Sequence, residues 1–295
     1  MFKLEPFTKT YIEEQFVEGK RSLAEIYENG SAPIFDICEY FPHLVKFSLD
    51  IIFETKENST NKNVLELTDI NGWGMIHYIS KFSTSKIIKH AFDLFVENNL
   101  DILKAANTNW NPLHTICKYQ SLGTIKYVID ICIENKFDIV KTTNTGWAPI
   151  HFICRYQTLE TIKYIVDVYN GNDLDITASN NKDWAPIHDI CRYSTLEIIK
   201  YMIDIYNSNS LDLTTTNRGG WAPIHIICRY QTFEAIKYIV NIYVKNKLPI
   251  PGSVEIYDGE PTDYHTLDVL LYINPHIQEG DFGSELDEII NLLDG

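Results

Sequence analysis

Histidine and cysteine recur as a His-x-x-Cys pair, and these are residue types that can bind a metal ion. On a helix, residues three apart share one face, and both side chains are zinc ligands. A zinc site needs about four ligands, however, and each pair supplies two with no second pair to complete the set. The spacing therefore favours packing over metal binding, and we expect no metal or other cofactor. The pairs are His114/Cys117, His151/Cys154, His188/Cys191 and His225/Cys228.

The sequence lacks the motifs of the common enzyme classes. It has no glycine-rich phosphate loop, no nucleophile elbow and no kinase or protease signature. Carboxylates are numerous but recur at equivalent positions, which is typical of solvated faces and turns in a repeat. They include Asp93, Asp130, Asp167 and Asp204, and Asp101, Asp138, Asp175 and Asp212. We therefore expect a protein without enzymatic activity.

The pairs belong to a repeat with a period of 37 residues. All five tryptophans follow this interval, as do a histidine, an aromatic residue and a lysine of each unit. The unit reads approximately N-x-G-W-A-P-I-H-x-I-C-R-Y-x-T-L-E-x-I-K-Y-I-V-D-I-Y, followed by a polar stretch and L-D-I. Self-similarity at a fixed period predicts a solenoid of stacked units. The tryptophans are Trp73, Trp110, Trp147, Trp184 and Trp221.

Each unit is predicted to form two helices and a loop. After Trp147, Ala148-Pro149 is typical of a helix start, because proline is tolerated in the first turn, and this helix runs to about Tyr156. Thr158 is a candidate N-cap for a second helix, which has apolar residues at helical spacing and ends near 170–172. The Asn-, Asp- and Gly-rich segment that follows predicts a projecting finger loop. The fold class is therefore all-α, a helix-turn-helix repeat solenoid.

The segment Ala148-Pro149-Ile150-His151-Phe152-Ile153-Cys154 resembles the T-P-L-H-x-A-A signature of the ankyrin repeat, and the resemblance spans most of the chain. It implies that the histidine hydrogen-bonds to loop backbone and that the cysteine fills a small core position. The usual ankyrin period of about 33 residues is exceeded here, which we assign to the second helix and its loop. The wording G-W-x-P-I-H-x-I-C-R-Y is similar to ankyrin arrays encoded by giant DNA viruses of amoebae.

About seven units are expected, and the first and last are degenerate caps, because an internal unit at an end would expose its stacking face. In the first cap, Phe35 stands in the histidine place and Ser31 in the tryptophan place. Residues 264–270 and 284–293 resemble the helices of the last unit. The expected organisation is an N-terminal helical extension at 1–30, with one or two helices between Tyr11 and Tyr27, a capping repeat at 31–68, five repeats at 69–250, and an inserted loop with a C-terminal capping repeat at 251–295.

Charge and hydropathy limit the partners and the location. The chain has 25 Lys and Arg against 40 Asp and Glu, and its formal net charge of −15 disfavours nucleic acids and anionic membranes as partners. No window offers the roughly 18 apolar residues that cross a bilayer, and the N-terminal residues lack the apolar core of a signal peptide. Four of the six cysteines follow the repeat, so reduced, buried thiols are expected. These features indicate an intracellular, cytoplasmic protein, located in the host cytoplasm if the chain is viral.

The ankyrin resemblance places three residues of each unit on the inner, concave side, namely the tryptophan and the two residues after the cysteine. Trp, Arg and Tyr are enriched at binding hot spots. Trp over Arg would also give a cation–π contact of about 0.5 to 2 kcal/mol, so a structural and a binding role both stay open. The candidate partner-binding residues are Trp73, Trp110, Trp147, Trp184, Trp221, Lys118, Arg155, Arg192, Arg229, Tyr119, Tyr156, Tyr193 and Tyr230.

The interpretation is a non-enzymatic ankyrin repeat protein that mediates protein–protein interaction through its concave face and finger loops. The partner would be a protein, and a host protein if the chain is viral; we expect no nucleic acid, membrane or small-molecule substrate. Specificity would come from positions that differ between units, such as the finger tips and the residue after the repeat histidine, which is Tyr78, Thr115, Phe152, Asp189 or Ile226. The alternative is a structural or self-associating spacer protein, in which the repeated side chains satisfy one another.

Overall fold

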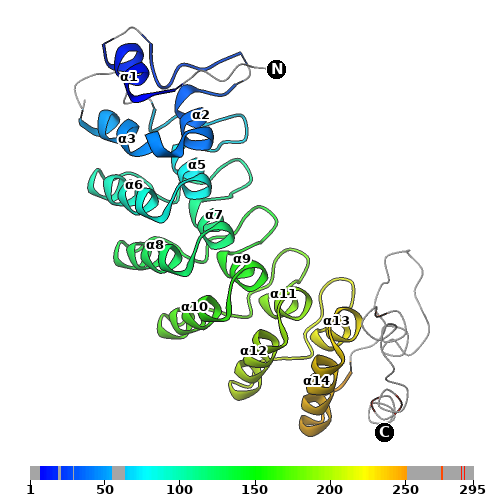
Figure 1. Cartoon of the computed structure of the whole chain (residues 1–295). Coiled ribbons are helices and arrows are strands. Elements are labelled where there is room, and N and C mark those ends of the chain that lie inside the picture. Colours follow the sequence, from blue (N-terminus) through cyan, green and yellow to red (C-terminus); the bar gives the residue numbers. More distant parts are fainter. Residues whose placement is uncertain are drawn as a thin grey trace. The chain divides into compact units, whose positions relative to one another are not determined.

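A computed structural model of the chain describes residues 7–18, 21–28, 30–54 and 64–250, together with residues 274, 287 and 289. Thirteen α-helices and no strand lie within these ranges. Two helices and a loop alternate along the chain, so the helices lie in pairs (Figure 1). The predicted all-α fold class is confirmed. None of the described helices combines the length and the apolar character that a membrane span requires.

The first helix of each pair has eight residues, and in five of the six it begins at a proline. Proline costs nothing there, because the first four N–H groups of a helix have no partner within it. The backbone becomes extended directly after the last helical residue, as at Gln157, and this ends the helix. The first helices are α2 (Pro33–Tyr40), α5 (Met75–Phe82), α7 (Pro112–Tyr119), α9 (Pro149–Tyr156), α11 (Pro186–Tyr193) and α13 (Pro223–Tyr230).

The second helix of each pair is longer and, from α6 onward, follows a Ser or Thr N-cap, including the predicted Thr158. After this helix the backbone passes through a positive φ, and the next amide bonds back to the helix, as Phe137 N–H does to the Cys132 carbonyl oxygen (2.8 Å). The second helices are α3 (Val45–Glu54), α6 (Ser85–Glu97), α8 (Leu122–Glu134), α10 (Leu159–Gly171), α12 (Leu196–Ser208) and α14 (Phe233–Asn246). The left-handed residues are Asn99, Lys136, Asp173, Ser210 and Lys247.

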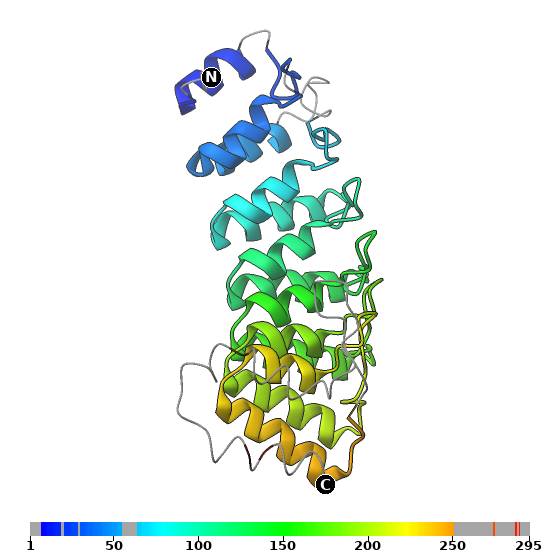
Figure 2. The same cartoon turned by 90° about the vertical axis from the view of Figure 1, so that its right-hand side faces the viewer.

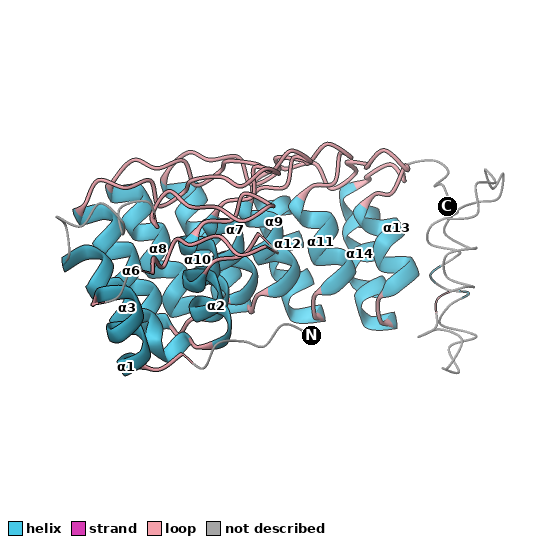
Figure 3. Cartoon of the chain, turned by 90° about the horizontal axis from the view of Figure 1, so that it is seen from above, coloured by secondary structure: helices cyan, strands magenta, loops and turns pink. Residues whose placement is uncertain are grey.

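The chain divides into two compact parts, residues 1–144 and 145–295. In the first part α5 packs between α2 and α7, and α6 packs between α3 and α8. In the second part α11 packs between α9 and α13, and α12 packs on α14. Within each part, first helices therefore contact first helices and second helices contact second helices (Figure 2). The loops of each part gather along one edge of these layers (Figure 3).

The core of a unit lies between its two helices. In the unit of α9 and α10, Ile150, Ile153, Ile162 and Ile165 each expose at most 2% of their surface. Burial of one such side chain contributes about 1.5 to 3 kcal/mol, so these positions supply much of the stability of the unit. All six cysteines are buried and free, and burial raises the pKa of the Cys154 thiol well above its ordinary value. The prediction of reduced, buried thiols is confirmed.

The N-terminal residues form one helical segment, α1 (Lys9–Ile12) continued by the π-helix η1 (Glu13–Val17). The segment packs near the first unit, where the Phe7 ring lies 5.5 Å from that of Phe41. No helix forms at residues 21–28, although one was expected up to Tyr27. The Ser22 hydroxyl there accepts the N–H of Ala24 (3.1 Å), a local bond that competes with helix formation. A short 3-10 helix, η2 (Pro42–Leu44), connects α2 to α3.

The structure describes three positions after residue 250. Asn274 binds the end of the preceding first helix, since its Nδ2–H donates to the carbonyl oxygen of Cys228 in α13 (2.7 Å). Apart from the helical residues Asp287 and Ile289, the helices expected at 264–270 and 284–293 lie outside the described residues. The four expected domain ranges stay a prediction.

A histidine in the first turn of α5, α9 and α11 joins one unit to the next. The Nδ1 atom of His151 accepts the N–H of Ala148 (3.1 Å), and its Nε2–H donates to the carbonyl oxygen of Trp184 in the following unit (3.1 Å). Because an amide N–H can only donate, the ring is the neutral Nε2–H tautomer. His77 and His188 each make the same two kinds of bond.

These bonds show that the His-x-x-Cys pair is a packing unit. Backbone groups occupy both ring nitrogens of His151, and Cys154 lies in the core. Burial lowers the pKa of His77, His151 and His188 to about 4, so the rings are uncharged at neutral pH. In the part of the chain that the structure describes, no cluster of three or more His, Cys, Asp or Glu side chains could hold a metal ion.

Replacing a left-handed residue by glycine is expected to stabilise the fold. Lys136→Gly and Ser210→Gly change exposed side chains and remove the steric cost of a positive φ. After the extra chain entropy of glycine is subtracted, each should raise the free energy of unfolding by about 0.5 to 1 kcal/mol, measured by urea denaturation. Alanine at the same positions keeps the Cβ atom and is the control; an equal gain with alanine would contradict the prediction.

The neutral histidine predicts a loss of stability in acid. The pKa of His77 is about 4 in the folded chain against about 6.5 unfolded, so its contribution is complete above pH 6.5 and is lost as the pH falls toward 4. Between pH 7.5 and about pH 5, the wild type should lose about 2 kcal/mol more unfolding free energy than His77→Gln, because glutamine does not titrate. Urea denaturation of both proteins measures this difference, which cancels the effects of other groups. An equal loss in both would show that the ring is charged in the folded state.

Candidate protein-binding surface

Arginine and tyrosine side chains from successive first helices stack on one another in the part at 145–295. They occupy the last two positions of α9, α11 and α13, so each pair is one repeat period from the next. We call this set the Arg/Tyr ladder. It consists of Arg155, Tyr156, Arg192, Tyr193, Arg229 and Tyr230.

In the ladder, a guanidinium group lies over the tyrosine of its own helix and that of the next. The Arg155 Cζ atom is 5.4 Å from the ring centroid of Tyr156 and 4.2 Å from that of Tyr193. Its Nη2–H also donates to the Tyr193 hydroxyl (3.0 Å). The Arg192 Cζ atom is 5.3 Å from the Tyr193 centroid and 4.6 Å from that of Tyr230. At exposed sites such contacts contribute about 0.5 to 1 kcal/mol each, so the ladder stabilises the stacking of units.

Lysine takes the place of arginine at the ends of α5 and α7. The Lys118 Nζ atom lies 5.0 Å from the ring centroid of Tyr119. Lys81 Nζ lies 5.8 Å from the centroid of the same Tyr119, and 4.6 Å from that of Phe82 on its own helix. It is also 5.7 Å from the ring of Trp73. A cation of one unit thus reaches the aromatic ring of the next unit here too.

The ladder is stacked and accessible at the same time. Tyr119, Tyr156 and Tyr193 expose 47%, 47% and 43% of their surface, and Arg155 and Arg192 are half-buried. The expectation that tryptophan would lie over these two arginines is wrong, because their aromatic partners are tyrosines. Arginine is the last but one residue of the first helix, whereas tryptophan precedes that helix, so the guanidinium group reaches the tyrosines beside it.

The five tryptophans are half-buried and lie beside the histidines that join the units. The Trp147 ring centroid is 5.3 Å from that of His151, and four of the five tryptophans make this contact at 5.3 to 5.4 Å. Trp221 lies 6.2 Å from Tyr230 of the ladder. The tryptophans therefore link the histidine bridge to the first-helix face, and much of each ring serves the fold.

The residue five positions after the tryptophan differs between units, and the structure shows why it matters. In the first cap Ser31 Oγ–H donates to Asp36 (3.0 Å), and in a later unit Trp110 Nε1–H donates to the Thr115 hydroxyl (2.7 Å). In two other units this residue is apolar, Phe152 or Ile226, and buried. The residue at this position therefore lies against the side chain in the tryptophan place. Whether that side chain has a polar or an apolar neighbour depends on this residue.

In the unit of α11 this position is Asp189, a carboxyl group with no exposed surface. Among the described residues, neither of its oxygens accepts a hydrogen bond. The nearby indole Nε1–H of Trp184 does not meet hydrogen-bond geometry. Burial raises the pKa of Asp189 to about 7, against the opposing effects of Arg155, the Trp184 N–H and Arg192. The sequence marked this position as variable but gave no sign of its burial, because aspartate is mostly exposed in proteins.

A second set of contacts joins the second helices and was missed in the sequence. The Tyr127 hydroxyl donates to Asp93 of the preceding unit, and Lys89 of that unit lies 4.6 Å from the Tyr127 ring. Tyr238 likewise donates to Asp204, with Lys200 of the preceding unit 5.3 Å from its ring. Asp204 lies on an exposed face, as expected, and Asp93 is half-buried; both carboxylates also join one unit to the next. The shared period of Lys, Tyr and Asp was the available signal.

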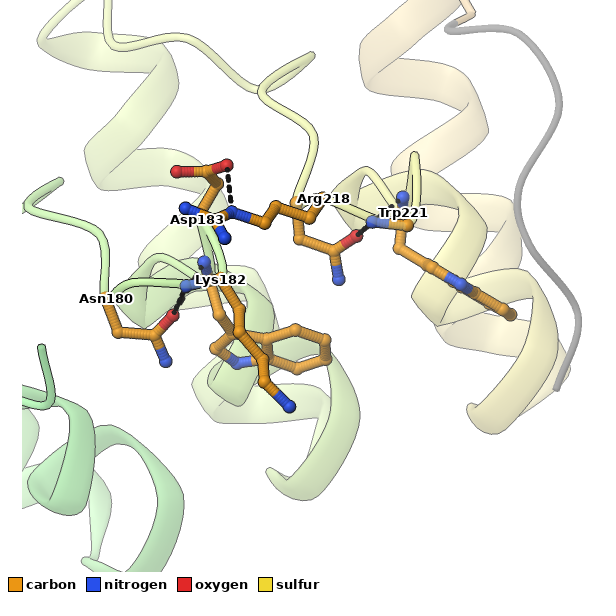
Figure 4. Close-up of polar contacts among 8 residues, drawn as sticks. Asn180, Lys182, Asp183, Arg218 and Trp221 are labelled. Carbon is orange, nitrogen blue, oxygen red and sulfur yellow. Dashed lines mark hydrogen bonds and ion pairs between the residues drawn. The ribbon is translucent and has the colours of Figure 1, made fainter. Parts of the chain in front are cut away.

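The finger loops are hairpin-like turns shaped by their own polar residues. Asn180 Oδ1 accepts the N–H groups of Lys182 (2.8 Å) and Trp184 (3.2 Å), and its own N–H bonds to the Trp184 carbonyl oxygen (3.1 Å). Asn217 repeats this arrangement with the N–H of Trp221 (Figure 4). Asp69 makes the same kind of bonds at its finger, whereas Ala106 has no side-chain group that could accept them, so the first tip residue shapes the loop in some units and not in others.

Neighbouring fingers also pair with each other. The Arg218 N–H donates to the Lys182 carbonyl oxygen (3.0 Å), and its side chain forms an ion pair with Asp183 (3.3 Å; Figure 4). In residues 64–144, Asn144 pairs with Thr108 through the same backbone bond (2.8 Å). Several tip side chains face solvent, among them Ile70, which is 83% exposed, and Arg218, whose side chain is 70% exposed.

The comparisons with known proteins agree with this geometry. Residues 76–178 match the family model described as Ankyrin repeats (3 copies). Among solved structures, the ankyrin repeat domain of Bcl-3, a member of the IkappaB protein family, is similar with a TM-score of 0.54 and 11% sequence identity. That alignment covers 83% of this chain and 100% of the Bcl-3 chain. No curated protein sequence matches significantly.

These matches confirm the resemblance read from the A-P-I-H-x-I-C segments, whereas no relative supports the similarity to arrays of giant viruses. At 11% identity the likeness to Bcl-3 shows the fold and nothing of its function. The paired helices, the histidine bridge and the paired fingers together show that the chain folds as an ankyrin repeat solenoid.

Proposed function

We propose that the chain is a non-enzymatic protein-interaction module whose partner binds the face formed by the ends of the first helices and the finger loops. The observation that carries this proposal is the exposure of Tyr156 and Tyr193, at 47% and 43%, beside half-buried cations in the part at 145–295. Tyrosine and arginine are the residue types that most often dominate binding energy at protein interfaces. Ankyrin repeats generally mediate interactions between proteins.

The rigidity of the ladder supports this function. Arg155 is held by two rings and by a hydrogen bond to Tyr193, so its side chain is already ordered before a partner arrives. Ordering a flexible side chain on binding costs about 0.5 to 1.5 kcal/mol, and a pre-ordered one avoids most of that cost. A face built for stacking between units is therefore also suited to recognition.

Charge and sequence support the other parts of the proposal. Nucleic acid is disfavoured as a partner by the net charge of −15, and the sequence carries none of the common catalytic motifs. The wording of the repeat, which is similar to arrays of giant viruses, favours a host protein as partner and the host cytoplasm as location. The variable, exposed side chains of Ile70 and Arg218 would add specificity at the fingers.

The alternative function is a structural or self-associating spacer. The cation–π contacts between units favour it, because they show that much of the ladder is satisfied within the chain. In that case the exposed tyrosines would contact a second copy of the chain. Concentration-dependent dimerisation that is lost in the tyrosine variant described next would support the spacer over the interaction module.

Removal of two exposed tyrosines should lower the affinity for the partner without unfolding the chain. Wild type and Tyr156→Ala/Tyr193→Ala are compared for capture of proteins from a lysate of the natural host cell, and the captured protein is purified and its affinity measured. We expect the affinity to fall by at least about tenfold, as for interface hot spots. Circular dichroism checks that the variant keeps its helices.

The matched control is Tyr201→Ala/Tyr238→Ala, which removes two half-buried tyrosines from the second helices. It should bind the purified partner as wild type does. Equal loss in both double variants would indicate a general effect on stability, and unchanged binding in the first variant would place the site elsewhere.

A further inference from the structure

We infer that the Arg/Tyr ladder binds an extended acidic peptide segment that carries a carboxylate at every third residue, one for each arginine. This inference rests on the proposed function and adds the chemistry of the partner. It concerns the part at 145–295, where the three arginines lie on α9, α11 and α13.

The first argument is that two of these arginines lack an acidic partner. No carboxylate of the described residues lies within 4.0 Å of the guanidinium groups of Arg155 or Arg192, although the chain has 40 acidic residues. Exposed arginines elsewhere do find one, since Arg21 pairs with Glu25 and Arg218 with Asp183. Arg155 donates to a neutral hydroxyl group and Arg192 lies over neutral rings, so their positive charge is not neutralised by an ion pair.

The second argument is the distance between successive charges. The two guanidinium carbons that flank Tyr193 are 4.2 and 5.3 Å from its centroid, so at most 9.5 Å separates Arg155 from Arg192. The distances at Tyr230 are 4.6 and 5.0 Å, which limits the separation of Arg192 and Arg229 to 9.6 Å. In a polyproline-II segment three residues advance about 9 Å and complete one turn, so side chains three residues apart point the same way. Helices in contact lie roughly 8 to 10 Å apart, which agrees with both limits, so a carboxylate at every third residue matches the spacing of the arginines.

The third argument is the mixed character of the surface. The rings of Tyr156 and Tyr193 each leave more than two fifths of their surface exposed beside the arginines. An extended peptide presents the residues between its carboxylates to such rings, which bury apolar groups while the hydroxyl stays wet. Carboxylates also suit guanidinium groups well, since the fork of N–H donors can bind both oxygens at once. The net charge of −15 makes a nucleic acid the weaker candidate for the same arginines.

Asp189 connects this site to pH. The charged and titratable groups that affect its carboxyl are Arg155 and Cys154 from α9 and Arg192 from its own helix, while α13 carries the apolar Ile226 at the equivalent position. Burial keeps the Cys154 thiol neutral. The pKa of Asp189 is about 7, and the two arginines lower it. A bound carboxylate would offset that effect and raise this pKa further, so binding would take up protons.

The register of the ligand tests the inference on the unchanged protein. Two fluorescent peptides of equal composition are titrated with the full chain at low salt, one with glutamate at every third position and an isomer with the glutamates adjacent. We expect the first to bind about tenfold more tightly, because it alone reaches all three arginines at once. Equal affinities, or no saturable binding of either peptide, would overturn the inference. Tighter binding of a labelled oligothymidylate would overturn it in favour of a nucleic acid.

Arginine variants locate the site. Arg155→Gln and Arg192→Gln should each weaken binding of the spaced peptide about tenfold, as expected for loss of a hydrogen bond to a charged group. Arg218→Gln removes the same charge from the exposed finger and should change the affinity less than about twofold. A loss of equal size in Arg218→Gln would indicate non-specific attraction and contradict the assignment.

Asp189→Asn provides a readout that a purely structural role would not affect. In the wild type, affinity for the spaced peptide should rise severalfold as the pH falls from about 8 to about 6, because the carboxyl group takes up a proton on binding. In Asp189→Asn this dependence should vanish, with affinity at high pH at least that of the wild type. The same pH dependence in the variant would overturn the coupling between Asp189 and the bound carboxylate.

Failure of this inference is distinguishable from failure of the proposed function. If the Tyr156→Ala/Tyr193→Ala variant loses a captured partner while the spaced peptide shows no preference, the face binds a protein of another chemistry. If the spaced peptide binds in register but no protein depends on the tyrosines, the anion site exists and the proposed function is wrong.

Discussion

A neutral imidazole ring that bridges two backbone groups is the interaction on which each stacked part of the chain depends. His151 accepts a bond at the start of its own helix and donates one to the Trp184 carbonyl oxygen in the next unit. That carbonyl group also closes the finger hairpin of the next unit, through the N–H of Asn180. One ring therefore sets the start of a helix and the position of the following loop, and it can do so only while uncharged.

The remaining contacts between units involve three other regions of each unit. The fingers pair through backbone bonds, the ends of the first helices pair through cations and aromatic rings, and the second helices pair through tyrosine and aspartate. Because all of these use repeated residues, they leave little room for variation. Units differ at positions such as Ile70, Asp189 and Arg218, and also at the ends of the first helices, where Lys118 stands in place of arginine.

The sequence predicted those features that local chemistry determines. Pro149 and Thr158 mark helix starts through backbone preferences that act within a few residues. The resemblance of the A-P-I-H segment to the ankyrin signature predicted that the histidine hydrogen-bonds to loop backbone. Which aromatic residue Arg155 lies over was not predicted, because that depends on where a side chain at a helix end points relative to the next unit.

Geometry between units also explains the other misses. Tyr127 binds Asp93, which is 34 residues away, one helical turn short of the period, so a search for equal spacing does not connect them. The burial of Asp189 depends on packing against neighbouring units and has no local signature.

The acceptor of the histidine bridge is a main-chain carbonyl group, and this has a consequence for how such a chain can change over time. Any unit offers that carbonyl group whatever its side chains, so any unit can follow any other. Duplication or deletion of a whole 37-residue cassette therefore leaves no histidine without its acceptor. The array can grow or shorten by recombination between its own copies, and only an interaction that depends on one particular neighbour, such as the electrostatic effect of Arg155 on Asp189, would be lost.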